Sequence, residues 1–305
     1  MKILLTGGSG MVGRNILEHE KLKSHNLIAP SRKELDLLDP ENIKSFLNTQ
    51  KPDLVIHAAG KVGGIQANIN NPIGFLMDNL KMGTDLIYSS FDLGIPYLIN
   101  LASSCMYPKD AINPLNEEMI LSGKLEPTNE GYALAKTIST RLCEYISKED
   151  SSKRYKTIIP CNLYGRFDKF DPENSHLLPA IIQKIHNAKK NGYKKISIWG
   201  DGSARREFMY CRDLADFIFF AIENINKIPQ NINVGIGHDY SITEYYKTVA
   251  KAIGFEGDFN YDVSKPVGMK QKLVDVTKIR KMGWVSKTPL EEGITETYKF
   301  FKESS

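Results

Sequence analysis

A tyrosine and a lysine stand four positions apart in the segment LEPTNEGYALAK, residues 125–136. Side chains at positions i and i+4 share one face of a helix, so Tyr132 and Lys136 are expected to lie side by side. A free phenol titrates near pH ~10, and an ammonium ~4 Å away favours the phenolate by roughly 4 kcal/mol at an effective dielectric of about 20. We therefore expect Tyr132 to donate a proton to a carbonyl oxygen, with Lys136 lowering its pKa and holding the ribose of a nicotinamide cofactor. The spacing alone also arises by chance in helices.

A second reactive segment, ASSCMY at residues 102–107, precedes this pair and contains Cys105. A thiol with an ordinary pKa near ~8.5 is suited to act as an acid or a base. A cysteine is often simply a small buried hydrophobic residue, and spacing alone does not separate these interpretations. The other cysteines, Cys143, Cys161 and Cys211, are interpreted as packing residues.

Glycine spacing at the start of the chain predicts a nucleotide site. The segment TGGSGMVG, residues 6–13, follows an apolar strand and opens a helix, with glycines at Gly7, Gly10 and Gly13. In such a turn the first glycine permits the tight bend, the second lets the backbone approach a pyrophosphate, and the third packs helix against strand. The helix N-terminus then offers free N–H groups to the phosphates. A glycine-rich turn without a ligand is the alternative.

The residues after the next strand bear on which dinucleotide binds. A cofactor without a 2′-phosphate usually meets an Asp or Glu there, but this strand ends in APSRKEL, with Ser31 and Arg32 at that place. A hydroxyl and a planar, permanently charged guanidinium suit a phosphate, so we predict NADP(H) rather than NAD(H). Asp36 and Leu37 follow where the adenine would lie. Arg32 as a plain solvated charge is the alternative.

Alternating strands and helices must position these residues. Apolar runs predict strands at residues 2–8, 26–31, 53–60, 97–104, 156–165, 196–202 and 231–237. Apolar residues at helical spacing predict helices at 10–23, 40–50, 75–94, 130–149 and 241–254, and a strand end followed by a helix within 209–225. This alternation is typical of an α/β protein with a Rossmann-type doubly wound parallel sheet.

The pattern changes after residue 165, where Pro, Asp, Asn and Phe crowd the sequence. We therefore predict two domains. The Rossmann domain would comprise residues 1–165 plus about 206–237, and a smaller C-terminal substrate-binding domain about 166–205 and 238–305.

Composition is that of an ordinary globular protein, with 41% hydrophobic and 25% charged residues among 305. A net charge of +4 is too small to indicate a nucleic-acid partner, but it suits an anionic ligand. The four cysteines and six histidines show no metal-binding spacing, and unpaired thiols indicate a reducing compartment. No apolar run approaches the ~20 residues of a membrane span. We expect a soluble cytoplasmic protein that binds neither metal nor membrane.

The motifs also resemble those of a known family. TGGSGMVG, SSCMY and YALAK are similar to the extended short-chain dehydrogenase/reductase superfamily. Further blocks resemble the GDP-L-fucose synthase family, whose activity is that of a GDP-4-keto-6-deoxymannose 3,5-epimerase/4-reductase. These blocks extend over nearly the whole chain and include AAGKVGGIQAN at 58–68, ENSHLLPA at 173–180, WGDGSARREF at 199–208 and KQKLVDVTKIRKMGW at 270–284.

The resemblance implies roles for individual residues. Ser103 would polarise the substrate carbonyl together with Tyr132, and Cys105 and His176 would be the acid and base groups of epimerisation. A capping or core histidine is the alternative for His176. Further cofactor-binding positions implied are Met11, Val12, Ala58, Asn162, Leu163 and His176. Implied substrate-binding positions are Lys184, Trp199, Arg206 and Lys272.

The chemistry that the resemblance implies is coherent. A ketone at sugar C4 acidifies the C–H bonds at C3 and C5, so one site can enolise the sugar, reprotonate it from the opposite face and reduce the same ketone. The partner would be a GDP-linked 4-keto-6-deoxy sugar, and residues 75–94 and 130–149 would form a homodimer interface. Lys184 departs from the arginine expected in this family, and Gly131 from the expected proline, which leaves the exact sugar open.

Other functions remain open at this point. The nearest is a pure 4-reductase that acts on a GDP-6-deoxy-4-keto-hexose or -heptose without epimerisation. A related 4,6-dehydratase would retain the hydride on a tightly held NAD, which fits neither Arg32 nor Cys105. A regulatory protein that binds NADP(H) without turnover has no need of Ser103, Tyr132 and Lys136 together.

Overall fold

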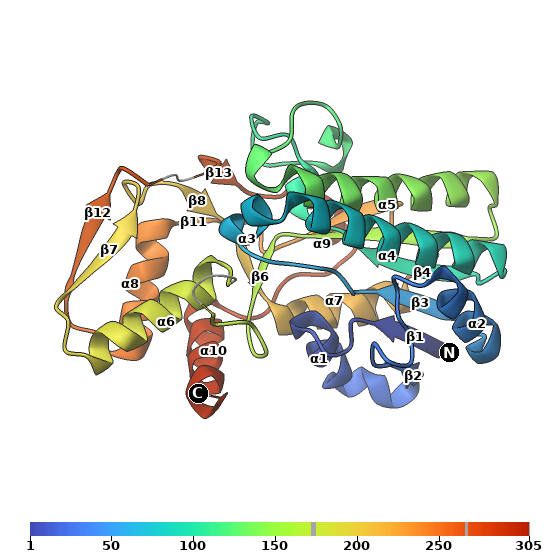
Figure 1. Ribbon diagram of the computed structural model, residues 1–305, viewed down its shortest axis with the longest axis horizontal. Helices are drawn as coiled ribbons and strands as arrows, with labels where there is room; N and C mark the ends of the chain where they lie inside the picture. The colour runs from blue at the N-terminus through green and yellow to red at the C-terminus, as the bar shows by residue number, and fades with distance from the viewer. Residues whose placement is uncertain (172–174, 266–267, 305) are drawn as a thin grey trace.

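The core of the molecule is a six-stranded sheet, shown in Figure 1. The computed structural model describes residues 1–171, 175–265 and 268–304, so the ENSHLLPA motif begins outside the described residues. The strands are β1 (Lys2–Thr6), β2 (Asn26–Ile28), β3 (Leu54–His57), β4 (Tyr97–Leu101), β5 (Arg154–Pro160) and β10 (Asn231–Val234). They lie in the order β10-β5-β4-β3-β1-β2, and every neighbouring pair is parallel. The predicted Rossmann-type sheet is confirmed.

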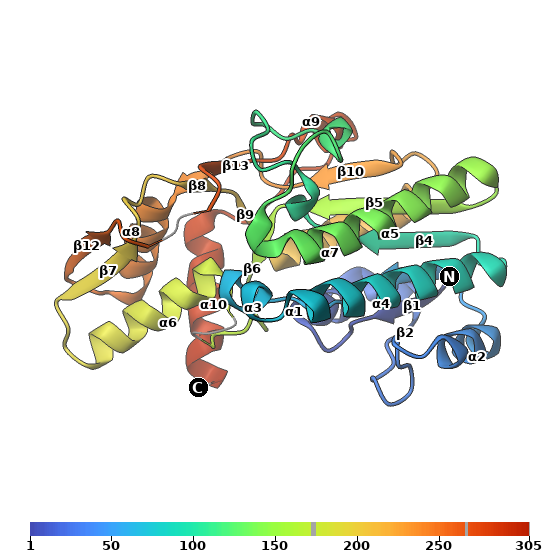
Figure 2. The same cartoon turned by 45° about the horizontal axis from the view of Figure 1, so that its top comes forward.

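Helices cover both faces of this sheet. The helices are α1 (Met11–Leu17), α2 (Pro40–Gln50), α4 (Pro72–Asp92), α5 (Glu130–Glu149) and α7 (Cys211–Glu223). Side chains of α1 and α7 share one buried cluster with Ile3 and Ile56, whereas those of α2 and α4 share another with Leu4 and Val55. Alternate residues of each strand therefore enter opposite cores, which explains why the strands are mostly apolar. Figure 2 shows α4 and α5 side by side in front of the sheet.

The C-terminal part has a core of its own. Its helices are α6 (Leu177–Lys190), α8 (Ile242–Ile253) and α10 (Leu290–Ser304), and its short strands are β7 (Lys195–Trp199), β8 (Arg205–Arg206), β11 (Tyr240–Ser241), β12 (Asp258–Asp262) and β13 (Gln271–Lys272). The three helices bury Ile181, Val249 and Ile294 in one cluster. After β13 the chain returns to the main core, where Val274 and Trp284 are buried. The division into two domains stays a prediction.

The predicted strand at 156–165 is in fact two strands in different sheets. β5 ends at Pro160, and β6 (Asn162–Tyr164) pairs with β9 (Phe208–Tyr210) outside the main sheet. The Cys161 N–H still donates to Val234 O at 2.9 Å, so the chain leaves the sheet only after this residue. Apolar residues continue from β5 into β6, and a run of this kind does not record a change of partner strand. The break carries residues 162–164 toward the C-terminal part.

Other boundaries also differ. The predicted helix at 10–23 ends as α1 at Leu17, and a 3₁₀ helix, Glu20–Ser24, follows. α4 begins at Pro72, earlier than predicted, because Asn71 caps it by accepting a hydrogen bond from Gly74 N at 3.0 Å. α3 (Ile65–Asn70), α6, α9 (Thr277–Lys281) and α10 were not predicted. None of the helices in the described ranges is long and apolar enough to cross a membrane.

Candidate active site

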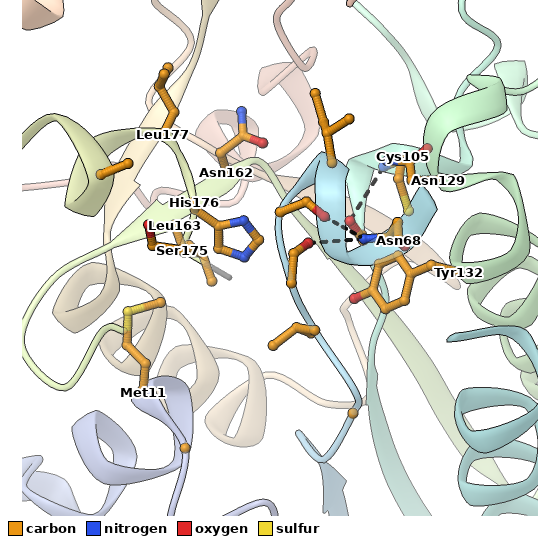
Figure 3. Close-up of a pocket in the computed structure, with 18 of the residues that line it drawn as sticks. Met11, Asn68, Cys105, Asn129, Tyr132, Asn162, Leu163, Ser175, His176 and Leu177 are labelled. Carbon is orange, nitrogen blue, oxygen red and sulfur yellow. Dashed lines mark hydrogen bonds between the residues drawn. The ribbon is translucent and has the colours of Figure 1, made fainter. Parts of the chain in front are cut away.

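A cleft of about 1420 Å³ lies between the carboxyl ends of the main-sheet strands and the C-terminal part (Figure 3). Among the residues that line it are the glycines of the first turn, the Tyr132–Lys136 pair and His176. It also contains every other predicted site residue except Ser31. Ser31 is exposed, and its backbone N–H donates to the Glu34 carboxylate at 2.8 Å. One cavity therefore joins the predicted cofactor and sugar ends.

The glycine turn has the shape that a dinucleotide requires. Gly7 has a φ of +73°, and a Cβ there would lie 2.7 Å from Ala59 N. A Cβ on Gly13 would lie 2.2 Å from Gly7 O, so α1 packs directly on the turn. A Cβ on Gly10 would meet only Gly7 O, at 3.4 Å. The space in front of Gly10 is thus open, and only glycine leaves it free for a phosphate.

Arg32 stands at the rim of the cleft. Its side chain is 75% exposed, and Nε lies 3.6 Å from Asp36 Oδ1. An exposed pair at this distance contributes little to stability, so the guanidinium can turn toward an anion at small cost. Asp36 is fixed by a bond from its N–H to Asn42 Oδ1 at 2.8 Å.

Tyr132 and Lys136 share the first turns of α5, as predicted, but their electrostatic relation differs from the expectation. Lys136 Nζ donates to Leu101 O at 2.9 Å and lies 5.8 Å from the centre of the Tyr132 ring. Burial lowers the pKa of Lys136 to about 8 and raises the pKa of Tyr132 above its ordinary value. The prediction of a lowered pKa for this phenol is wrong, because burial is the largest influence and raises it. The phenol therefore stays protonated and able to donate.

Ser103 links the phenol to the thiol. It caps the 3₁₀ helix Ser104–Met106, where its Oγ accepts a hydrogen bond from Cys105 N at 3.3 Å. A hydrogen bond with Ser103 lowers the pKa of Tyr132, against the larger effect of burial. The Cys105 side chain is buried, and burial raises the pKa of its thiol, while Lys272 acts in the opposite direction. Ser103 thus touches both groups that the predicted chemistry needs.

His176 lies across the cleft from Tyr132 and Cys105 in Figure 3. It occupies the position before α6, and its side chain makes no capping bond there. Burial lowers its pKa below 6.5, and the charges of Lys169 and Lys272 lower it further. The imidazole is therefore neutral at pH 7 and able to accept a proton. A thiol and an imidazole on opposite walls could address opposite faces of one sugar ring.

Cationic side chains gather at the C-terminal wall. Arg206 on β8 and Lys272 on β13 are paired in register, and both are half-buried. Burial lowers the pKa of each, and the negative charge of Glu126 acts in the opposite direction. Lys184 donates from α6 to Ser197 O and lies 6.0 Å from the Tyr246 ring. This arrangement suits a diphosphate, which needs several donors and positive charges.

Three lining residues that sequence reasoning missed carry buried atoms without a hydrogen-bond partner in the described part of the chain. These atoms are Asn68 Oδ1, Asn129 Oδ1 and Ser175 Oγ. Asn68 is 6% exposed, and its Nδ2 donates to the carbonyls of Gly63 and Gly64 at 3.0 Å, so only its acceptor is left. Buried polar atoms are normally satisfied, so these atoms indicate a polar ligand. The AAGKVGGIQAN block holds Asn68, but nothing in its spacing singled this residue out.

The comparisons with known proteins agree with this geometry. Residues 3–237 match the model of the NAD dependent epimerase/dehydratase family. The chain belongs to this family. It is 59% identical over 301 residues to the GDP-L-colitose synthase of Yersinia pseudotuberculosis, covering 99% of this chain and 98% of that protein. It is 51% identical to the GDP-L-fucose synthase of Azorhizobium caulinodans, covering 98% and 96%. The resemblance seen in the motifs is confirmed.

Solved structures of similar proteins have the same fold. A GDP-mannoheptose C4 reductase from Campylobacter jejuni, with NADP bound, superposes with a TM-score of 0.88 at 32% identity. The match covers 99% of this chain and 98% of that one.

Proposed function

We propose that this family member is an NADPH-dependent enzyme that reduces C4 of a GDP-linked 4-keto-6-deoxy sugar after epimerising it at C3, C5 or both. One observation carries the proposal. Tyr132 and Cys105 stand on one wall of a single cleft and His176 on the other, beside a cationic wall. Ser103 is hydrogen-bonded to both Cys105 and Tyr132. NADPH, when bound, supplies the hydride. The open space at Gly10 and the exposed Arg32 support this cofactor, which the C. jejuni heptose reductase also binds.

The chain's own residues hold and protonate the ketone. Ser103 and Tyr132 point their hydroxyls at the carbonyl oxygen, which gains negative charge as the ketone is reduced. Tyr132, protonated because burial raises its pKa, gives its proton to that oxygen. Lys136, held by Leu101 O, keeps a positive charge beside the developing anion. Arg206, Lys272 and Lys184 hold the diphosphate and sugar.

Epimerisation uses the same ketone before reduction. The carbonyl acidifies the C–H bonds at C3 and C5, and an oxyanion formed on removal of either proton is stabilised by Ser103 and Tyr132. His176, neutral at pH 7, accepts the proton from one face. Cys105, a thiol at that pH because burial raises its pKa, donates a proton to the other face. Inversion at a carbon requires both groups.

A second candidate substrate is the 3-deoxy counterpart of this sugar. The relative with 59% identity is named for L-colitose, which is L-fucose without the C3 hydroxyl. On that substrate only C5 has a configuration to invert. Lys184 and Gly131, where the fucose synthase family is expected to have arginine and proline, lie at the cleft or directly before Tyr132 and fit a remodelled sugar pocket.

Proton NMR in D₂O tests the function and separates the candidates. GDP-4-keto-6-deoxymannose and its 3-deoxy analogue are each incubated with the enzyme, first alone and then with NADPH. We expect deuterium at C3, C5 or both before any reduction, followed by NADPH consumption. Reduction without exchange would make the protein a plain 4-reductase. Neither exchange nor NADPH oxidation with either sugar contradicts the proposal and leaves the regulatory alternative.

We also propose that the chain works as a homodimer through α4 and α5. Both helices expose apolar side chains at helical spacing: Ile73, Met77 and Tyr88 on α4, and Leu134, Ile138 and Tyr145 on α5. Contiguous exposed apolar surface of this kind marks protein interfaces. The two helices pack closely, since a Cβ on Gly83 would lie 2.3 Å from Ser139 Oγ.

Light scattering at micromolar concentration should give twice the chain mass for the wild type. Ile138→Asp places a charge in the proposed interface and should give a monomer. Val285→Asp changes another exposed apolar residue, which follows Trp284, a side chain packed on Phe217 of α7, and should leave the dimer intact. A monomeric wild type would refute the proposed dimer.

A cytoplasmic location is proposed as well. Cys105, Cys143, Cys161 and Cys211 are all free and buried. Unpaired thiols persist in a reducing compartment.

A further inference from the structure

Glu207 is a fully buried carboxyl group next to the cationic wall. Its exposed fraction is 0%, and no basic side chain in the described ranges forms an ion pair with it. Its carboxylate is satisfied by backbone instead. Oε1 accepts from Gly237 N at 2.7 Å, and Oε2 accepts from Val274 N at 2.9 Å. A buried carboxyl without a cation is costly, so its presence calls for a reason.

The backbone of Glu207 adds two further bonds. Its N–H donates to Lys272 O at 3.2 Å, and its carbonyl accepts from Asn162 Nδ2 at 2.8 Å. One residue therefore joins β6, β13 and the turn after β10. A Cβ on Gly235 would lie 2.3 Å from Glu207 Oε1, so the turn leaves room for this carboxylate only because residue 235 is glycine.

The position of β13 depends on these bonds. The strand has only two residues, Gln271 and Lys272, and its partner β8 is equally short. Val274, which the carboxylate holds, lies two residues beyond Lys272, where the chain enters the main core. Fixing Val274 fixes the exit of β13. Together with main-chain bonds between Leu115 and residues Leu273 and Asp275, the carboxylate therefore helps to set where Lys272 lies in the cleft.

Lys272 bears directly on the thiol. Its charge is the largest influence that lowers the pKa of Cys105, against the effect of burial. Arg206, next to Glu207 in sequence, faces Lys272 across β8 and β13. A displacement of β13 by even a small amount would change both the field at Cys105 and the cation pair that holds the substrate.

We propose that Glu207 is a positioning residue that sets the place of Lys272 in the substrate site through its bonds to β13 and Val274. It touches neither substrate nor cofactor. The inference rests on the proposed function for its substrate. It predicts that loss of the carboxylate raises the KM for the GDP-sugar and leaves NADPH binding unchanged.

Glu207→Gln is the informative variant. An amide has one acceptor and two donors, so at Gly237 N or Val274 N it places donor against donor. We expect the KM for the GDP-keto sugar to rise about tenfold, the effect of one buried unsatisfied group. The Kd for NADPH should change less than twofold. Glu207→Asp keeps the carboxyl group with a shorter reach and should show the same split if the glutamine variant does not fold.

Asp213→Asn is the matched control. Asp213 is also a buried carboxylate that accepts backbone N–H groups, from Lys287 at 3.2 Å and Thr288 at 3.0 Å, but it lies outside the cleft. Both Asp213→Asn and Glu207→Gln should lower the melting temperature. Asp213→Asn should leave the KM unchanged. Equal KM changes in both variants would reduce Glu207 to a stabilising residue.

A double-mutant cycle decides whether Glu207 acts through Lys272. Lys272→Met alone should raise the KM, and adding Glu207→Gln to it should raise the KM no further, because the group being positioned is already gone. Multiplicative effects would overturn the inference. Failure of the wild type to turn over any GDP-keto sugar would instead contradict the proposed function. Turnover with an unchanged KM in Glu207→Gln would contradict this inference alone.

Discussion

Replacing Tyr132 with phenylalanine should lower the rate of NADPH-dependent reduction by roughly 10²–10⁴, the range for loss of a general acid. The phenol has a hydrogen bond with Ser103, and burial keeps its pKa above its ordinary value. Phenylalanine fills the same space in α5 and removes only the hydroxyl. Stopped-flow absorbance of NADPH under single-turnover conditions would measure the chemical step apart from product release.

The remaining activities of the Tyr132→Phe variant sharpen this test. NADPH binding should be unchanged, because the cofactor's predicted contacts at Gly10 and Arg32 lie elsewhere in the cleft. Tyr155→Phe is the matched control: its hydroxyl donates to Ile95 O at 3.0 Å in a buried position outside the cleft. It should lose stability by about 1 kcal/mol with reduction intact. Unchanged reduction in Tyr132→Phe would remove this residue from the chemistry.

The candidate site residues that the sequence predicted are mostly ones whose spacing along the chain is local. The glycine turn and the Tyr132–Lys136 pair each lie within one turn or helix, and the structure brings both to one cleft. The pKa relation of that pair was not predictable. It depends on burial by distant segments and on the carbonyl of Leu101, which takes the Lys136 ammonium. Desolvation is a property of the folded surroundings, and no spacing encodes it.

Side-chain contacts with main-chain groups could not be predicted from the sequence either. Glu207 is buried and bonded to main-chain N–H groups 30 and 67 positions away, and no local spacing records such contacts. Asn68 gave no signal because its two Nδ2 bonds go to carbonyls of its own loop. The switch of β6 to a second sheet likewise depends on its pairing with β9, where Asn162 lies opposite Phe208, 46 residues later in the chain.

Cys105→Ser should separate inversion from proton exchange. Serine has a far less acidic proton than a thiol, so delivery to the second face of the sugar should slow by roughly 10²–10⁴. His176 would still remove a proton and return deuterium to its own face. In D₂O the variant should therefore incorporate deuterium with retained configuration, whereas His176→Gln should incorporate none.

Two comparisons guard this result. Cys143→Ser changes a buried cysteine of α5 that packs in the cluster with Leu4 and Val55, outside the cleft. This variant should leave exchange and inversion unchanged. The opposite pattern, with exchange lost in Cys105→Ser and kept in His176→Gln, would exchange the assigned roles and make the thiolate the base.

The pH dependence of exchange in the wild type tests the same assignment without a mutation. Burial, with Lys169 and Lys272, lowers the pKa of His176 below 6.5, and burial raises the pKa of Cys105 above 9. Between these values the imidazole is neutral and the thiol protonated, so the rate should be flat through neutral pH. It should fall as the pH drops through the His176 pKa, because the imidazolium cannot accept a proton. A rate that instead rises with pH toward 9 would show that thiolate formation limits exchange, and Cys105 would then be the base.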